Sequence, residues 1–220
     1  MTESQTLIDG PRLAPLSGGP ATALIVLLHG YGSSGDDLIQ LAMQLQPLFP
    51  DAAFVAPHGH LTLGHPAQRA WFLLTQPMTE EQRRQGADAA RPVIDGFIDA
   101  ERDRLGLTDA QVALVGFSQG TIMSLHVALR RSAPVGAVVG FSGMLAARDR
   151  LDDIAARPPV TLIHGDRDPV IPIASMEAGA AALAGAGVPV TKVVSPGLGH
   201  SIDMRGMYAA AEALQRALAS

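Results

Sequence analysis

The feature that most constrains the fold of this chain is a short glycine-bracketed sequence, Gly116-Phe117-Ser118-Gln119-Gly120, set between a strand pattern and a helix pattern. The run 111–115 before it is short, apolar and rich in β-branched residues, which is typical of a buried strand. The run 121–131 after it has apolar residues at helical spacing and a basic last turn, which is typical of a helix. A chance pattern in a glycine-rich chain is the alternative, but the two flanks favour a tight strand-to-helix turn that lifts the Ser118 hydroxyl above a sheet.

Strand and helix patterns alternate along nearly the whole chain. Besides the run before Gly116, the expected strands are 23–28, 53–56, 135–141 and 160–164, with an extended segment at 188–194. Besides the run after Gly120, the expected helices are 36–46, 87–105, 175–186 and 203–219, and Pro92 favours a start of the second nearer Arg91. The segment 58–85 is expected to be irregular. This alternation predicts an α/β fold, with a mostly parallel sheet covered by helices on both faces.

Length and composition limit the remaining choices. A chain of 220 residues without a polar, low-complexity linker is expected to form one domain over 1–220. The net charge of −5 and the scattered lysines and arginines argue against a nucleic-acid or anionic-membrane partner. Because the chain has no cysteine, disulfides, thiolate metal sites and cysteine nucleophiles are excluded.

The sequence also predicts where the protein resides. Residues 1–5 are polar, and the apolar run 6–8 is too short for the core of a signal peptide. No apolar stretch approaches the roughly 18 residues that a membrane span needs. We therefore expect a cytoplasmic protein without stable membrane insertion.

The order of residues along the chain indicates a partner for Ser118. In this architecture an acid and then a histidine follow the serine, each in a loop beyond the carboxyl end of a strand. Of the seven histidines, His200 alone follows the late acidic segment, and it lies in a glycine-rich loop before the last predicted helix. A solvated loop histidine is the alternative reading. We expect His200 to accept the Ser118 proton and to return it to a leaving group.

The acid has two candidates in the segment Gly165-Asp166-Arg167-Asp168-Pro169. Asp166 fits the common role of an aspartate that caps a turn. Asp168 precedes a proline, which favours extended backbone and a fixed carboxylate direction. The residues by themselves favour Asp168 only slightly.

Several motifs together resemble a known family. In chain order they are Leu28-His29-Gly30-Tyr31-Gly32, Ala70-Trp71-Phe72, Gly116-Phe117-Ser118-Gln119-Gly120, the run from His164 to Pro172, and Gly199-His200-Ser201. This set resembles the phospholipase/carboxylesterase family, small α/β-hydrolases that include acyl-protein thioesterases, and the resemblance extends from about Ala21 to the final helix. It implies a compact α/β-hydrolase fold and a serine hydrolase that cleaves carboxylic esters, thioesters or lysophospholipids through an acyl-enzyme. It also implies that Asp168 is the catalytic acid.

An oxyanion hole needs two backbone N–H donors. The residue after the nucleophile, Gln119, supplies one. The resemblance places the other at Tyr31, in a loop that Gly30 and Gly32 allow to approach the substrate. A simple tight turn at the strand exit is the alternative reading, and it is compatible with this role. We expect His29 to orient the loop by hydrogen bonding.

The apolar part of the segment 58–85 is expected to line one wall of a substrate groove, formed by Leu63, Trp71, Phe72 and Leu73. The competing interpretation is that some of them, Trp71 above all, pack the segment onto the domain. The connection from Gly143 to Pro159 is too short for a cap domain, so the site should be open. We expect small acyl esters or thioesters of short to medium chain length as substrates.

The chain departs from the family pattern at two positions. Thr121 stands where many members have glycine, and we expect it to change only helix packing. Leu73 stands where an aspartate is frequent, which bears on substrate preference.

No metal or cofactor is expected. His58, His60 and His65 lie in a stretch broken by prolines and glycines, without a nearby carboxylate. Ser142-Gly143 lacks the glycine spacing of a second elbow and is expected to be a turn. Nucleotide-binding glycine motifs are missing from the sequence.

Three other functions compete with an esterase. The first is a hydrolase-fold protein that only binds a small acyl ligand, which an intact set of Ser118, Asp168 and His200 argues against. The second is a peptidase. The third, a dienelactone hydrolase, would call for a cysteine nucleophile that the chain lacks. The sequence leaves the oligomeric state open and is compatible with a homodimer.

Overall fold

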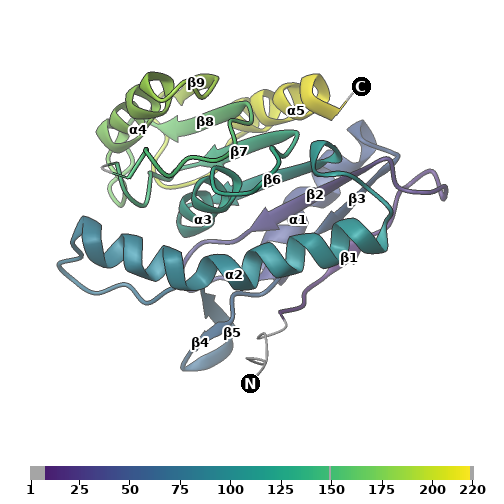
Figure 1. Cartoon of the computed structure of the whole chain (residues 1–220), viewed down its shortest axis with the longest axis horizontal. Coiled ribbons are helices and arrows are strands. Elements are labelled where there is room, and N and C mark those ends of the chain that lie inside the picture. The colour runs from purple at the N-terminus through teal and green to yellow at the C-terminus, as the bar shows by residue number, and fades with distance from the viewer. Residues whose placement is uncertain (1–7, 149, 219–220) are drawn as a thin grey trace.

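A seven-stranded sheet forms the centre of the protein, in a computed structural model that describes residues 8–148 and 150–218 (Figure 1). The strand order is β1-β3-β2-β6-β7-β8-β9, and neighbours run parallel except for the antiparallel pair β1 and β3. The strands are β1 (Arg12–Leu13), β2 (Ala23–Leu28), β3 (Ala52–Val55), β6 (Val112–Phe117), β7 (Ala137–Phe141), β8 (Val160–Gly165) and β9 (Val190–Ser195). Predictions for two stretches lie outside the described residues: the start of the chain, 1–7, and Ala219 at the end of the closing helix.

Helices cover both faces of this sheet, which confirms the predicted α/β fold. The α-helices are α1 (Gly35–Leu45), α2 (Glu80–Arg104), α3 (Gln119–Ala128), α4 (Ile173–Gly185) and α5 (Met204–Leu218). Short 3₁₀ turns are η1 (Gln46–Leu48) and η2 (Asp109–Gln111).

Each face of the sheet has its own hydrophobic core. Leu24, Val26 and Leu28 of β2 point to the core under α2, α3 and α4. The alternate residues of the strand, Ala23, Ile25 and Leu27, point to the core under α1 and α5. Because side chains alternate along a strand, a strand buried on both faces is apolar throughout, as the sequence of β2 is.

The segment predicted to be irregular, 58–85, contains a β-hairpin, so that prediction is wrong in part. Its strands are β4 (Leu61–Leu63) and β5 (His65–Ala70), which pair in antiparallel fashion. Arg69 also exchanges backbone hydrogen bonds with residues 32 and 33, at 2.8–2.9 Å. The hairpin therefore supports the loop that follows β2.

Helix α2 begins earlier than predicted, at Glu80 instead of between Ala87 and Arg91. The Thr79 hydroxyl accepts a hydrogen bond from the Gln82 N–H at 3.1 Å, and the Gln82 side chain accepts one from the Thr79 N–H at 2.9 Å. This capping box fixes the first turn. Pro92 lies inside the helix and removes one backbone donor without ending it.

Other boundaries shift by a few residues. The elbow helix is α3 (119–128) instead of 121–131, and the strand predicted over 135–141 begins at Ala137.

In the part of the chain that the structure describes, no cap domain follows β7. The described residues between Ser142 and Pro159 form neither helix nor strand. Leu145, Ala146 and Ile154 of this connection are buried in the core under α2, α3 and α4. These residues of the connection therefore pack onto the domain, and its described part forms no lid over the carboxyl edge of the sheet.

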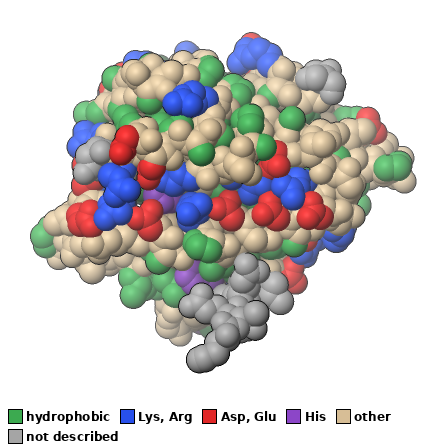
Figure 2. All heavy atoms as spheres, viewed as in Figure 1, with side chains coloured by type: hydrophobic (Ala, Val, Ile, Leu, Met, Phe, Trp, Pro, Cys, Tyr) green, Lys and Arg blue, Asp and Glu red, His purple; other side chains and the backbone are tan. Residues whose placement is uncertain are grey.

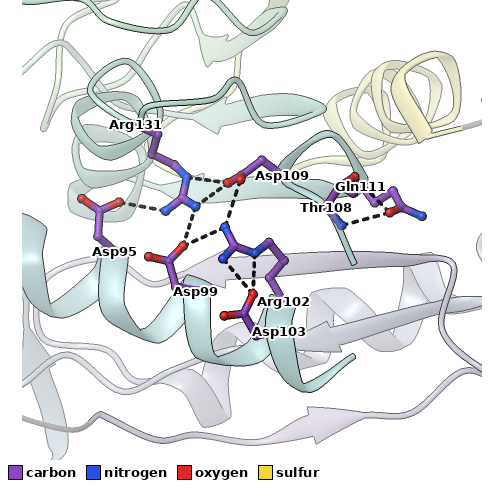
Figure 3. A network of polar contacts seen from close by, with 8 residues as sticks. All are labelled: Asp95, Asp99, Arg102, Asp103, Thr108, Asp109, Gln111 and Arg131. Atoms are coloured by element: carbon purple, nitrogen blue, oxygen red, sulfur yellow. Dashed lines mark hydrogen bonds and ion pairs between the residues drawn. The ribbon is translucent and has the colours of Figure 1, made fainter. Parts of the chain in front are cut away.

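Acidic and basic side chains alternate along α2 (Figure 2). At the centre of the network in Figure 3, the buried guanidinium of Arg131 contacts Asp95 at 3.0 Å, Asp99 at 2.7 Å and, more closely still, Asp109. Burial raises the pKa of Asp95, and the charge of Arg131 opposes that shift. The network ties the second half of α2 to the segments that follow α2 and α3.

Candidate active site

Ser118 lies at the turn between β6 and α3, with a backbone conformation that L-residues rarely adopt, φ 54° and ψ −115°. The turn needs glycine on both sides. A Cβ atom on Gly116 would lie 2.5 Å from the Gly120 backbone, and one on Gly120 would lie 1.7 Å from the Leu28 carbonyl oxygen. The strand-to-helix turn predicted from the sequence is therefore present, with the serine at its apex.

Thr121 packs the elbow against β7. Its hydroxyl oxygen lies 2.7 Å from the Phe141 carbonyl oxygen and 2.8 Å from that of Gly116. Its methyl group fills space next to Gly140 and Gly143, where a Cβ atom would lie 2.4 Å from it in either case. The threonine and these two glycines therefore fit one another.

His200 and Asp168 form the most direct side-chain contact of the site. The Nδ1 atom of His200 lies 2.7 Å from Oδ2 of Asp168. The other oxygen, Oδ1, accepts hydrogen bonds from the N–H groups of Val170 and Ile171, at 2.8 and 2.9 Å. Burial alone would raise the pKa of Asp168, but the hydrogen bond from His200 and these two N–H groups outweigh it and hold that pKa below its usual range. Asp168 is therefore an anion fixed against the histidine ring.

Asp166 occupies a different position. Its Oδ1 accepts a hydrogen bond from the Gly197 N–H at 2.6 Å, three residues before His200. It thus joins the loop after β8 to the loop after β9, whereas the sequence suggested only a local turn. Of the two candidate acids, the one in contact with the histidine is Asp168.

His164 is a supporting residue to which the sequence analysis gave no role. It is buried, and its Nε2 donates to the Ile171 carbonyl oxygen at 2.8 Å and lies 3.3 Å from Oδ2 of Asp168. It closes the turn that holds the Asp168 carboxylate. The signal in the sequence that could have indicated this role is its position directly before Gly165-Asp166, at the start of the motif that contains Asp168.

Ser118 and His200 lie at the same edge of the sheet. The ring of Phe117, the residue before the serine, lies 4.9 Å from the ring of His200 between centroids. Within the described part of the chain, no hydrogen bond joins the Ser118 hydroxyl to the imidazole. Such bonds are often long in the absence of substrate and shorten when it binds.

His29 is buried beneath the loop after β2 and holds it from both sides of the ring. Its Nε2 accepts from the Gly59 N–H at 2.8 Å, so Nδ1 carries the proton that it donates to the Gly30 carbonyl oxygen, also at 2.8 Å. The indole N–H of Trp71 donates to the His29 carbonyl oxygen at 2.9 Å. Burial lowers the pKa of His29 to about 4, so the ring is neutral at pH 7.

Two backbone N–H groups near Ser118, those of Gln119 and Tyr31, have no backbone partner among the described residues. The Gln119 N–H is at the first position of α3, where it has no partner within the helix. The Tyr31 N–H takes part in no backbone hydrogen bond to another described residue. Gly30 brings this loop close to the nucleophile, since a Cβ atom there would lie 3.3 Å from that of Ser118.

The side chain of Gln119 has a second role that the sequence did not predict. It is buried, its Oε1 accepts from the Trp71 N–H at 2.9 Å, and its Nε2 donates to the Phe72 carbonyl oxygen at 2.8 Å. The predicted groove segment is thereby fastened to the elbow.

A cavity of about 490 Å³ lies along this segment, bordered by Trp71, Phe72 and Leu73. The indole of Trp71 is fully buried and Phe72 nearly so, whereas Leu73 is 61% exposed. Leu63, at the end of β4, is not among the lining residues, whereas Leu61 and Met78 are. Trp71 thus serves mainly to pack the segment onto the domain, and Leu73 is the predicted groove residue that solvent reaches most readily.

The three loop histidines do not converge. The Nδ1 atoms of His58 and His65 accept hydrogen bonds from the N–H groups of Gly35 and Ala67, each at 3.2 Å. His60 borders the cavity beside Trp71. Ser142, at the second serine-glycine pair, has a positive φ of 47° and follows β7 in a turn.

A parallel sheet with a serine elbow after its central strand, and an acid and a histidine in later loops, defines the α/β-hydrolase class. The model of the phospholipase/carboxylesterase family matches residues 16–218, and the chain belongs to this family. It is accordingly a hydrolase that acts on ester bonds.

Relatives of known name agree with this assignment. Esterase YpfH of Escherichia coli (strain K12) is 35% identical over 196 residues, which cover 89% of this chain and 83% of the relative. Acyl-protein thioesterase 1 of Gibberella zeae is 26% identical over 212 residues, which cover 86% of this chain and 89% of that protein. The crystal structure of esterase PE8 superposes with a TM-score of 0.91 at 40% identity, covering 96% of this chain and 99% of that one.

None of the described helices is both long and apolar enough to cross a membrane.

Proposed function

We propose that the protein is a carboxylesterase that works through an acyl-enzyme on Ser118, with His200 as general base and Asp168 as its partner. The observation that carries this proposal is the 2.7 Å contact between His200 Nδ1 and Asp168, beside a serine held at a strained elbow. Because Nδ1 is engaged by a carboxylate, the free Nε2 is the ring atom that can accept the serine proton.

In the proposed reaction, the Ser118 oxygen attacks the ester carbonyl carbon while His200 Nε2 takes the hydroxyl proton. The negative charge that develops on the carbonyl oxygen is stabilised by the N–H groups of Tyr31 and Gln119. The imidazolium then protonates the leaving alcohol as the C–O bond breaks. A water molecule, deprotonated by the same ring, attacks the acyl-enzyme and releases the carboxylic acid and free Ser118.

We further propose acyl groups of short to medium length as substrates, bound along Leu73 and its neighbours. The support is the cavity of about 490 Å³ beside the 71–73 segment, together with a connection after β7 whose described residues form no lid. Each additional methylene should improve binding by about 0.8 kcal/mol only while the cavity covers it. Thioesters are a second candidate class, favoured by the name of the acyl-protein thioesterase relatives.

The catalytic assignment is tested by covalent labelling. A fluorophosphonate probe should modify the native protein stoichiometrically, and peptide mass spectrometry should locate the probe on Ser118. Labelling at another residue, or none in a protein that hydrolyses esters, would refute the assignment. The substrate assignment is tested separately, by kcat/KM for esters and thioesters of increasing acyl length. A jump in rate when a long-chain substrate forms an interface would indicate a mobile lid and contradict the open site.

A further inference from the structure

A second cavity, of about 350 Å³, lies beside the candidate active site. Its walls are the first turn of α2 with Glu80 and Arg83, the loop after β7 with Met144 and Arg148, and the start of α4. These three walls meet at the edge of the sheet toward which the parallel strands point (Figure 1). It is distinct from the cavity along the 71–73 segment, with which it shares no lining residue.

Two of the walls continue directly from segments that hold the catalytic groups. A Cβ atom on Gly143 would lie 3.1 Å from the Ser118 carbonyl oxygen, and Met144, the next residue, lines the cavity. On the other side, the loop that fixes Asp168 through the N–H groups of Val170 and Ile171 runs straight into Pro172, which also lines it. A substrate held at Ser118 can therefore extend toward this cavity.

The cavity carries a positive charge that the protein does not neutralise. Arg148 and Glu80 form a pair, with Nη2 3.1 Å from Oε2 and the Arg148 N–H donating to Oε1 at 2.6 Å. Arg83 is half-buried, and its guanidinium donates a long hydrogen bond to the Ala146 carbonyl oxygen, at 3.5 Å. Within residues 8–148 and 150–218, no carboxylate lies within ion-pair distance of Arg83. Burial lowers the pKa of Arg83, the negative charge of Glu80 opposes that shift and the positive charge of Arg148 adds to it, and arginine remains charged at neutral pH.

The start of α4 adds to this positive potential. The helix has 13 residues, no acidic side chain in its first turn and no side-chain cap on its N-terminal N–H groups. Ala174 and Ser175 of that first turn line the cavity. The N-terminal end of a helix carries a partial positive charge, so it favours an anion in the same space as the Arg83 guanidinium.

We propose that this cavity is a subsite for a carboxylate carried by the substrate, bound by the Arg83 guanidinium, so that the enzyme prefers esters with an anionic end. The guanidinium fork matches the two oxygens of a carboxylate. The proposal rests on the proposed function, because the bound carboxylate belongs to an ester cleaved at Ser118.

The test compares matched ester pairs. Mono-p-nitrophenyl glutarate and p-nitrophenyl valerate have acyl chains of equal length, ending in a carboxylate and a methyl group respectively. A second pair, the butyrate esters of 3-hydroxypropanoate and of propanol, places the carboxylate on the alcohol side. The wild-type enzyme should prefer the anionic member of at least one pair. Arg83→Gln should reduce that anionic-to-neutral ratio of kcat/KM about tenfold, mainly through KM, as expected for loss of a charged hydrogen bond.

Arg91→Gln is the matched control. Arg91 lies two turns further along α2, about 12 Å away along the helix axis, and its side chain is 37% exposed. Arg91→Gln removes the same charge from the same helix and should leave the anionic-to-neutral ratio of kcat/KM at its wild-type value. Arg83→Lys keeps the charge and should retain part of the preference that Arg83→Gln loses. An equal ratio in wild type and Arg83→Gln for both pairs, or an equal fall in Arg91→Gln, would overturn the subsite.

Failure of the subsite and failure of the esterase proposal are distinguishable. Hydrolysis of neutral esters tests the esterase without involving the carboxylate. Titration calorimetry with glutarate tests the subsite without catalysis, and Arg83→Gln should weaken this binding about tenfold. Wild-type protein that binds glutarate no better than the variant would contradict the assignment, whatever its activity.

Discussion

Replacing His29 with glutamine should make the stability of the protein less sensitive to mild acid. The ring is fully buried, and its Nε2 accepts a hydrogen bond from the Gly59 N–H. A proton on Nε2 would break that bond and place a charge in the core. Burial accordingly lowers the pKa of His29 to about 4, from an ordinary value of 6.5.

The size of the effect follows from this difference. Between pH 6.5 and 4 the unfolded chain binds a proton at this histidine that the folded protein does not bind, so acid favours unfolding. The stabilisation is complete above pH 6.5 and declines as the pH falls toward 4. From pH 7.5 to 5.0, this one ring should remove about 2 kcal/mol from the free energy of unfolding.

Urea unfolding at the two pH values measures this change, followed by the fluorescence of the single tryptophan, the buried Trp71. Glutamine can accept and donate hydrogen bonds but does not titrate, so His29→Gln should lose about 2 kcal/mol less than wild type over this interval. The exposed His65 provides the control, and His65→Gln should follow the wild type. His126, whose pKa burial also lowers to about 4, contributes equally in all three proteins. Equal pH dependence in wild type and His29→Gln would refute the argument.

Three further pairs of substitutions, each a test with its control, examine other parts of the structure. Asp168→Asn should reduce kcat/KM for a soluble ester about 100-fold or more, whereas Asp166→Asn, which loses only a loop contact, should cost far less; the reverse ranking would contradict the assigned acid. Gly120→Ala should destabilise the protein by about 3 kcal/mol or more in urea unfolding, because its Cβ would overlap the Leu28 carbonyl oxygen. Gly185→Ala, with nothing within 4 Å, should be neutral or slightly stabilising, and equal losses would argue against the packing of the elbow. Arg131→Leu should lower the free energy of unfolding by about 2 kcal/mol and not more, because the three carboxylates that Arg131 contacts are partly solvated. This loss should be smaller at high salt, which screens the ion pairs. Arg216→Leu on the surface should cost less than about 0.5 kcal/mol.

The sequence predicted the parallel strands of the sheet and its helices because the buried strands are apolar throughout and the helices show their own period. It did not predict the two-residue edge strand β1 or the β4–β5 hairpin. The sequence of β5, His65-Pro66-Ala67-Gln68-Arg69-Ala70, is polar and mostly exposed, so it lacks the alternation that marks a half-buried strand. Its pairing with β4 and with Ser33 is visible only in three dimensions.

The start of α2 could have been read from the sequence. Thr79 and Gln82 have the spacing of a capping box, but Pro92 suggested a later start. A proline in the middle of a helix is tolerated here because Ala87, Ala90 and Ile94 bury that face against the sheet.

Chain order and motifs predicted the residues proposed for catalysis. They did not predict the hydrogen bonds that hold these residues in place. The residues by themselves separated Asp168 from Asp166 only slightly, because both lie in one short loop, and the family resemblance was needed to choose Asp168; the contact with His200 distinguishes the two in three dimensions. The sequence could not show that the Gln119 side chain holds the 71–72 backbone, since 47 residues separate Gln119 from Phe72. Such contacts depend on how distant loops meet at the edge of the sheet.

The central claim, that Ser118 is the nucleophile, is tested most directly by the turnover of a soluble p-nitrophenyl ester by Ser118→Ala. The variant should keep the urea midpoint of the wild type, or exceed it, because alanine removes only a hydroxyl that makes no hydrogen bond to another described residue. Its kcat should fall by about 1000-fold or more, since binding and the oxyanion donors alone give little turnover. A folded Ser118→Ala protein that kept more than about a tenth of wild-type kcat would contradict the account, because a nucleophile is worth far more than that.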